Sequence, residues 1–308
     1  MENTRAKTTR NSLILLLTAT IWGMAFVSQS KGMDYMHPFT FNGVRSLIGA
    51  AGILVYILIS RKIAGDKATK LDWKLNVRAG LLCGIFLTIA STLQQFGIKY
   101  TSVGKAGFIT TLYIIFVPMF GIFLKKKVAP VVWAAAGMAA VGMYLLCMTE
   151  SLRLGAGDIM VFLCAIAFAI QIMTVAHYAA RIDGAVVSCI QFTVCGVVCC
   201  IGALIWGQPT FGQIQEGLGA LLYAGVLSCG VGYTLQIVGQ KGLNPTVAAL
   251  IMSLESVIAT ISGWIAYKIG FLSTDQTLTP RQIAGCVIVF AAVILVQLPP
   301  EWFRFGKK

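Results

Sequence analysis

The feature that most constrains this chain is a series of long apolar runs separated by short polar loops. Leu13–Gln29 is the first such run, and comparable runs recur to the end of the chain. A helix needs about 20 predominantly apolar residues to cross a hydrocarbon layer about 30 Å thick. The recurrence predicts ten transmembrane helices, over residues 12–30, 39–60, 77–98, 104–124, 129–147, 157–177, 185–206, 217–238, 245–268 and 281–298.

Composition agrees with a membrane protein. Hydrophobic residues make up 57% of the chain and charged residues 11%, whereas soluble domains average about 25% charged residues. The loops between the apolar runs are too short to form a separate soluble domain. We therefore expect an all-α polytopic membrane protein.

The positive charges indicate an orientation. Basic residues concentrate in alternate loops, as in Arg61, Lys62 and Lys125–Lys127. Cytoplasmic loops carry an excess of Lys and Arg, so we expect both termini in the cytoplasm and the chain in the cytoplasmic membrane. The net charge of +13 then reflects loops that face anionic membrane lipids, and no nucleic-acid partner is expected. The charge pattern does not distinguish a monomer from a homodimer.

Two segments half a chain apart repeat one another. LQQFGIKYTSVGKAGFI begins at Leu93 and LQIVGQKGLNPTVAALI at Leu235, so that Gln94 aligns with Gln236 and Gly97 with Gly239. A weaker alignment pairs Trp22 with Phe168. Five predicted crossings separate the two copies, and because five is odd the copies run in opposite directions. This pattern is typical of inverted-topology repeats.

The repeat predicts the domain organisation. We expect a cytoplasmic tail over 1–11, a first five-helix repeat over 12–147, a second, inverted repeat over 157–298 and a second tail over 299–308. Two such halves can exchange conformations and expose a central site to one side and then the other, which is alternating access. A duplication that only stabilises a helix bundle is the alternative.

Several segments resemble a known family. WGMAFVSQSKGM, FTFNGVRSLIGA, SLESVIATISGWIAYK and the repeated segments resemble bacterial members of the drug/metabolite transporter superfamily, EamA type, over essentially the whole chain. The resemblance implies ten helices, two EamA repeats and a cavity lined mainly by the first, third, fourth, sixth, eighth and ninth helices. It also implies secondary transport, with export more frequent than import. Two positions depart from the family pattern: Ser256 stands where Pro is common, and Tyr267–Lys268 replaces a common Gly-Glu.

Glu255 is the acidic residue predicted to lie near the middle of a span. It follows Pro245 by ten residues, which corresponds to a depth of about 15 Å in a helix. A carboxylate facing lipid there would cost at least about 2.5 kcal/mol, so Glu255 should face the bundle interior. It could bind a cationic group, carry a coupling proton, or hydrogen-bond between helices as a structural residue.

Arg45 is the basic residue predicted to lie inside a span. The FNGVR segment is common in the family, and this favours a gating or structural charge over substrate contact. If Arg45 reached the cavity, its planar guanidinium could hold a carboxylate. Together with Glu255 it would then suit a zwitterion such as an amino acid.

Aromatic and amide side chains complete the predicted substrate-binding site. Tyr113 occupies the repeat position equivalent to Glu255. An aromatic face beside a carboxylate can bind an amine through cation–π contacts of about 0.5–2 kcal/mol. The alternative for each aromatic residue is ordinary helix packing. The predicted substrate-binding residues are Glu255, Trp22, Tyr113, Phe26, Gln95, Gln171, Tyr233 and Trp264.

The motifs argue against other classes of function. There is no Walker-type glycine-rich loop, no HExxH or GxSxG motif and no cluster of metal ligands, so no enzyme, metal or cofactor is expected. We predict a secondary active transporter of a small organic solute, such as an amino acid, an amine or a related metabolite. Export is the expected direction, and a proton is the candidate coupling ion. The alternatives are a facilitative carrier or channel-like uniporter for a choline-like amine and, less favoured, a membrane-embedded enzyme.

Overall fold

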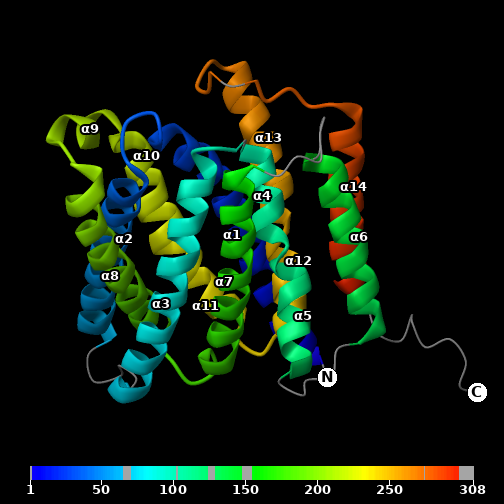
Figure 1. Cartoon of the computed structure of the whole chain (residues 1–308). Coiled ribbons are helices and arrows are strands. Elements are labelled where there is room, and N and C mark those ends of the chain that lie inside the picture. The colour runs from blue at the N-terminus through cyan, green and yellow to red at the C-terminus, as the bar shows by residue number, and fades with distance from the viewer. Residues whose placement is uncertain are drawn as a thin grey trace, which may run out of the picture.

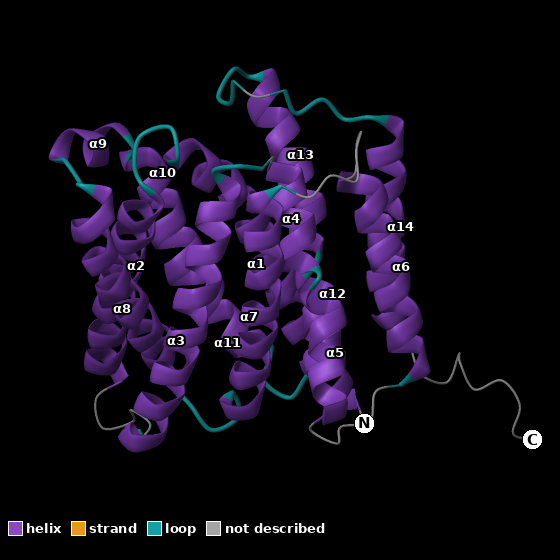
Figure 2. Cartoon of the chain, viewed as in Figure 1, coloured by secondary structure: helices purple, strands orange, loops and turns teal. Residues whose placement is uncertain are grey.

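The computed structural model describes residues 2–64, 71–101, 103–123, 129–147, 155–273 and 275–297, and the regular secondary structure in these ranges is helical (Figures 1 and 2). The first half contains α1 (Glu2–Gly32), α2 (Pro38–Ala64), α3 (Trp73–Ile98), α4 (Val103–Thr111), α5 (Tyr113–Phe123) and α6 (Pro130–Cys147). The second half contains α7 (Ala156–Tyr178), α8 (Gly184–Gly202), η2 (Ala203–Gly207), α9 (Phe211–Glu216), α10 (Leu218–Leu222), η3 (Tyr223–Gly232), α11 (Tyr233–Gly239), α12 (Pro245–Met252), α13 (Leu254–Lys268) and α14 (Pro280–Gln297).

The predicted all-helical class is confirmed. Within the described ranges, eight helical segments are long and apolar enough to cross a membrane. Two shorter apolar helices, over Pro130–Gly142 and Pro280–Leu295, coincide with the predicted fifth and tenth spans. The total of ten spans and the cytoplasmic position of both termini stay predictions.

The expected N-terminal tail is helical. Helix α1 begins at Glu2, so residues that were expected to precede the first span continue its helix instead. The run TRAKTTRNS contains no Gly or Pro that would end a helix. The expected C-terminal tail, 299–308, lies outside the described residues.

Polar side chains determine where several helices begin. The Asp72 carboxylate accepts a hydrogen bond from the Leu75 amide at the start of α3. Asp183 and Asn244 cap α8 and α12 in the same way, and Pro245 follows Asn244 at the first helical position. These residues satisfy amide groups that a helix leaves without partners.

Two spans predicted as single helices are broken within one residue of equivalent positions. Helix α4 ends at Thr111 and α12 ends at Met252, and the breaks at Leu112 and Ser253 lie in the middle of their spans. The hydroxyls of Thr111 and Ser253, which are repeat equivalents, donate to the Phe108 and Leu250 carbonyls at 2.9 and 2.7 Å. Such side-chain bonds compete with the helical hydrogen-bond ladder. Apolar periodicity is continuous across both breaks, so it did not predict them.

The predicted span 217–238 is also irregular. Its centre, η3, is a ten-residue π-helix between α10 and α11. A π-helix widens the backbone, and π-segments are frequent at functional sites. η3 packs against α1 and α2, where Gly225 allows close approach because a methyl group there would lie 2.9 Å from the Arg45 carbonyl oxygen.

The packing partners in the first half recur in the second. Helices α1 and α7 are repeat equivalents: α1 packs on α13, and α7 packs on α4 and α5. Helix α3 is equivalent to η3 and α11: α3 packs on α7, and η3 and α11 pack on α1. Helix α3 also packs on α8 as η3 packs on α2, while α6 and α14 pack against one another at the side of the bundle (Figure 1). Exchanging the halves therefore leaves the arrangement of contacts nearly unchanged.

Candidate functional site

A cavity lies in the middle of the bundle, where helices of both halves meet. Its volume is about 30 Å³. Space of this size holds one or two water molecules, whereas organic ligands occupy pockets of about 300–1,000 Å³. The lining residues are Trp22, Ala25, Phe26, Gln29, Arg45, Ser46, Leu87, Ser91, Gln94, Thr110, Tyr113, Phe168, Ile172, Phe192, Ser228, Cys229, Tyr233, Gln236 and Glu255. The cavity is therefore contracted, and little space is left between the side chains that line it.

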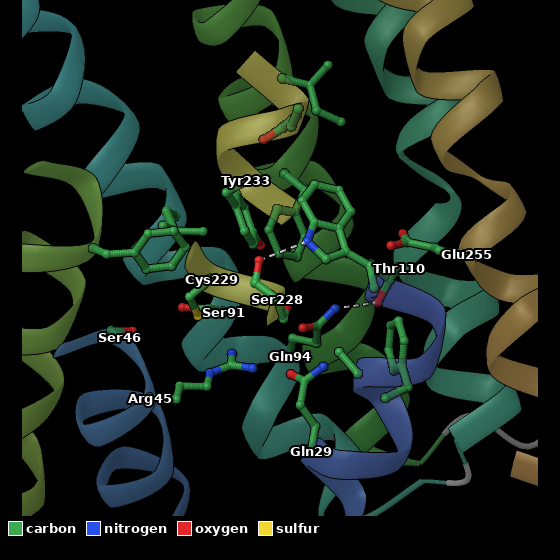
Figure 3. A pocket seen from close by; sticks show the side chains of 18 of the residues that line it. Gln29, Arg45, Ser46, Ser91, Gln94, Thr110, Ser228, Cys229, Tyr233 and Glu255 are labelled. Carbon is green, nitrogen blue, oxygen red and sulfur yellow. Dashed lines mark hydrogen bonds between the residues drawn. The ribbon is translucent and has the colours of Figure 1, made fainter. Parts of the chain in front are cut away.

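Two charged side chains face each other across this cavity. Among its described lining residues, Arg45 and Glu255 are the ones that carry charge, and both are about 95% buried. Figure 3 shows Arg45 on α2 at one side and Glu255 on α13 at the other, with Ser228 and Gln94 between them. The cavity thus has a cationic side and a carboxylate side.

Glu255 meets its repeat equivalent. The Tyr113 hydroxyl donates a hydrogen bond of 3.1 Å to Glu255 Oε1, and the two residues are 142 positions apart, which is the offset of the sequence repeat. Each residue lies at the start of the second half of a broken span, because Tyr113 is the first residue of α5 and Glu255 is the second residue of α13. The breaks place both side chains at one point in the bundle centre.

Aromatic rings form one wall of the cavity. The rings of Trp22 and Tyr233 lie 4.5 Å apart between centroids, and Phe192 contacts Tyr233 edge-on at 5.0 Å. Trp22 Nε1 donates to the Ser228 carbonyl in η3 at 3.4 Å, and Gly232 leaves room for the indole. The wall is therefore ordered by a hydrogen bond to the π-helical segment.

The predicted site residues divide into two groups. Six of them line the cavity: Trp22, Phe26, Arg45, Tyr113, Tyr233 and Glu255. Three do not. Trp264 is half-buried outside the cavity lining. Gln95 is fully buried and donates to the Gln29 backbone carbonyl, and Gln171 donates to the side chains of Gln191 and Gln236. Whether any of them binds substrate stays a prediction.

Several lining residues were missed by the sequence analysis. Gln94, rather than Gln95, faces the cavity and donates to Thr110 Oγ1 at 3.2 Å. Adjacent residues on a helix point about 100° apart, and two consecutive glutamines give no signal for which one faces inward. Ser228 and Cys229 line the cavity from the π-helical η3, and the hydropathy pattern of this span does not distinguish a π-helix from an α-helix.

Cys195 on α8 is buried next to hydroxyl groups of the cavity wall. In the described ranges, no group of three or more His, Cys, Asp or Glu side chains lies close enough to hold a metal ion. The Ser46 hydroxyl donates to Cys195 Sγ at 3.4 Å, and Ser91 Oγ lies at the same distance from that sulfur. These contacts join α2, α3 and α8 beside Arg45.

Comparisons with known proteins identify similar chains. The EamA-like transporter family matches residues 10–148 and 155–298. An uncharacterized transporter of Archaeoglobus fulgidus is 27% identical over 290 residues, which cover 92% of this chain and 84% of that protein. The uncharacterized transporter YwfM of Bacillus subtilis is 24% identical over 295 residues, 94% of each chain. A solved crystal structure has a TM-score of 0.74 at 16% identity and covers 96% of this chain and 99% of its own, so it supports the fold alone.

Proposed function

This chain belongs to the EamA-like transporter family and is a multi-pass protein of the cell membrane, and from that premise we propose that it is a secondary transporter of a small organic solute, working by alternating access. The family is one of transporters rather than enzymes. The proposed solute is an amino acid, an amine or a related metabolite, the proposed direction is export, and the proposed coupling ion is a proton.

The hydrogen bond between Tyr113 and Glu255 is the observation that carries the proposal. Two residues related by a two-fold axis can touch only if both lie near that axis. The contact between repeat equivalents therefore supports two halves, 12–147 and 157–298, related by an axis through the cavity. A carboxylate on such an axis is reached by both halves, and its surroundings change when either half moves.

Two matched glycine contacts suggest how the cavity is closed at each end. A methyl group at Gly97 would lie 2.8 Å from the Gly157 carbonyl oxygen and overlap Val161, so α3 and α7 touch there. A methyl group at the equivalent Gly239 would lie 3.2 Å from the Asn11 carbonyl oxygen, so α11 and α1 touch in the same way. Asn11 and Gly157 are themselves equivalent, because each lies eleven residues before the aligned pair Trp22 and Phe168.

Polar bonds accompany each glycine contact. Beside Gly97, the Thr101 hydroxyl and the Lys105 ammonium bind Asp158 at the start of α7. Beside Gly239, the Asn11 amide donates to the Lys241 carbonyl at 2.7 Å. We call these the Asp158 contact and the Asn11 contact. The starts of α1 and α7 lie at opposite ends of the bundle (Figure 1), and the charge pattern assigns the Asn11 end to the cytoplasm.

Both contacts are made in this structure, and the cavity between them is contracted. This combination corresponds to an occluded conformation. In the proposed cycle, releasing the Asn11 contact opens the cavity to the cytoplasm, and releasing the Asp158 contact opens it to the outside. Glu255 binds a proton or the amine of the solute, and Trp22, Phe26 and Tyr233 form an apolar and aromatic wall around it.

The Tyr113 hydroxyl has its own expected effect. In Tyr113→Phe the Glu255 carboxyl loses its described hydrogen bond while the ring volume is kept. One such bond contributes about 1 kcal/mol, so we expect the KM for an amine-bearing solute to rise about fivefold with little change in protein yield. Tyr56→Phe, at an exposed position of α2, is the matched control. An unchanged KM in Tyr113→Phe would argue that the hydroxyl is not part of the binding site.

Counterflow in proteoliposomes tests the proposed function. Vesicles preloaded with unlabelled amino acids or amines should accumulate the labelled solute transiently and saturably. Flux that does not saturate would replace the carrier with a channel, and flux that is unaffected by an imposed pH gradient would favour a facilitative uniporter. Failure to exchange any of a broad panel of amino acids and amines would contradict the proposed solute class.

A further inference from the structure

Arg45 is a buried cation without a described counterion. Its side chain lines the cavity and is 5% exposed. Among the described residues, no carboxylate forms an ion pair with it and no hydrogen bond to its guanidinium is found, and Nε is buried without a partner. The Phe41 ring lies 5.4 Å from the guanidinium carbon, and Cys195, Cys229 and Tyr233 lie near enough to interact with the guanidinium electrostatically. Leaving a buried charge uncompensated is strongly destabilising, so this arrangement needs an explanation.

The groups around Arg45 are already engaged elsewhere. The Ser46 hydroxyl donates to Cys195, and the Ser91 hydroxyl contacts Cys195 and the Thr88 carbonyl. Glu255, the carboxylate of the cavity, accepts from Tyr113 on the opposite side (Figure 3). The guanidinium is therefore left to face the cavity.

A second unpartnered polar side chain lies on the same side of the cavity. Gln29 on α1 is 4% exposed, lines the cavity, and its side-chain oxygen is buried without a hydrogen bond. Figure 3 shows the Gln29 amide and the Arg45 guanidinium together below Gln94. No hydrogen bond from the described residues engages this amide. Arg45 thus presents N–H donors to the cavity, and Gln29 presents an amide that has both a free acceptor oxygen and an NH2 donor group.

We infer that Arg45 and Gln29 form a carboxylate-binding subsite, so that the transported solute carries a carboxylate. A guanidinium binds the two oxygens of a carboxylate through parallel N–H donors, and the Gln29 amide supplies a further donor. The inference rests on the proposed function and narrows it. With an ammonium at Glu255 and a carboxylate at Arg45, the solute is a small zwitterion that spans the cavity once the halves separate.

This inference makes an unusual prediction about stability. In Arg45→Met, an apolar side chain of similar length replaces a buried charge that has no partner. Removing such a charge relieves its desolvation cost, so we expect the thermal unfolding midpoint of purified Arg45→Met to equal or exceed that of the wild type in dilute Tris chloride without added oxyanions. A structural role for Arg45 requires the opposite, a lower midpoint, and that result would overturn the subsite.

Minimal probes test the ligand class on the same samples. Acetate and glycine should raise the unfolding midpoint of the wild type. Arg45→Met should need about a tenfold or higher concentration of either compound for the same rise. Ethylammonium should act equally on both proteins, because it carries no carboxylate. Arg45→Lys, which keeps the charge without the planar fork, and Gln29→Leu should each give an intermediate response to acetate.

Three further results would overturn the subsite: no response of the wild type to either carboxylate, an unchanged response in Arg45→Met, or stabilisation by chloride equal to that by acetate. Each of these is distinguishable from failure of the proposed function. A wild type that exchanges amines in counterflow but shows no carboxylate response keeps the transport function and loses only this subsite.

Discussion

Glu255→Gln is expected to reduce solute counterflow about a hundredfold and to remove its dependence on pH. Gln keeps the size and shape of the side chain but can neither ionise nor release a proton. A charge-assisted contact contributes about 1.5–3 kcal/mol, and each 1.4 kcal/mol is a factor of about ten in affinity. The measurement is initial counterflow rate in proteoliposomes from pH 5 to 9, at matched amounts of inserted protein.

The same variant separates a functional Glu255 from a structural one. A Gln carbonyl can still accept the Tyr113 hydrogen bond, so the contact between the halves is preserved. We therefore expect normal insertion and an unfolding midpoint close to that of the wild type. Glu216→Gln, at an exposed position at the end of α9, is the matched control and should change neither rate nor pH profile. Unchanged transport by Glu255→Gln across this pH range would reduce Glu255 to a packing residue.

Gly97→Val and Gly239→Val are expected to abolish transport by opening opposite ends of the cavity. A side chain at either glycine meets the backbone of the facing helix, and overpacking of this kind costs about 1–3 kcal/mol. This cost falls mainly on conformations in which the affected contact is closed. Gly97→Val should therefore favour the state open at the Asp158 end, and Gly239→Val the state open at the Asn11 end.

Cys229 can report which end has opened. This cysteine lines the cavity and is 2% exposed in the occluded structure, so the wild type should react slowly with a membrane-impermeant maleimide. Gly97→Val should react from outside intact cells, whereas Gly239→Val should react in inside-out vesicles. Cys229→Ser in each background leaves only the signal of the other cysteines, which is subtracted, and Gly52→Val, where a methyl group meets nothing within 4 Å, controls for the substitution itself. Labelling of both variants from the same side would contradict the two-contact mechanism.

The fold was largely predictable from the sequence because a bilayer limits a chain to few solutions. Apolar runs of membrane length must form helices, since backbone polar groups have no other partner in lipid. The helix breaks at Leu112 and Ser253 were not predictable in this way. They depend on hydroxyl groups bonding to backbone carbonyls inside runs that stay apolar, and hydropathy does not register this.

The candidate site was predictable where charge or repeat position restricted the choice. Glu255 and Tyr113 stood out because one is ionisable in mid-span and the other is its repeat equivalent, and the two are in contact. Trp264 and Gln95 were chosen by residue type, but their orientation depends on how each helix is rotated, which neighbouring helices set. Arg45 was expected to be a gating or structural charge, and its position in the cavity wall became visible only once α2, α8 and η3 were packed together.

Labelling from the two sides of the membrane tests the central claim, that two oppositely oriented halves enclose one cavity. Tyr100→Cys and Asn244→Cys introduce exposed thiols in the loops inside the two repeated segments. Labelling of the wild type measures the contribution of the native cysteines. Above that level, an impermeant maleimide should label Tyr100→Cys in intact cells and Asn244→Cys only after the cytoplasmic face is exposed. If both thiols react from one compartment, the halves are parallel, and the shared two-fold site and the transport cycle built on it are wrong.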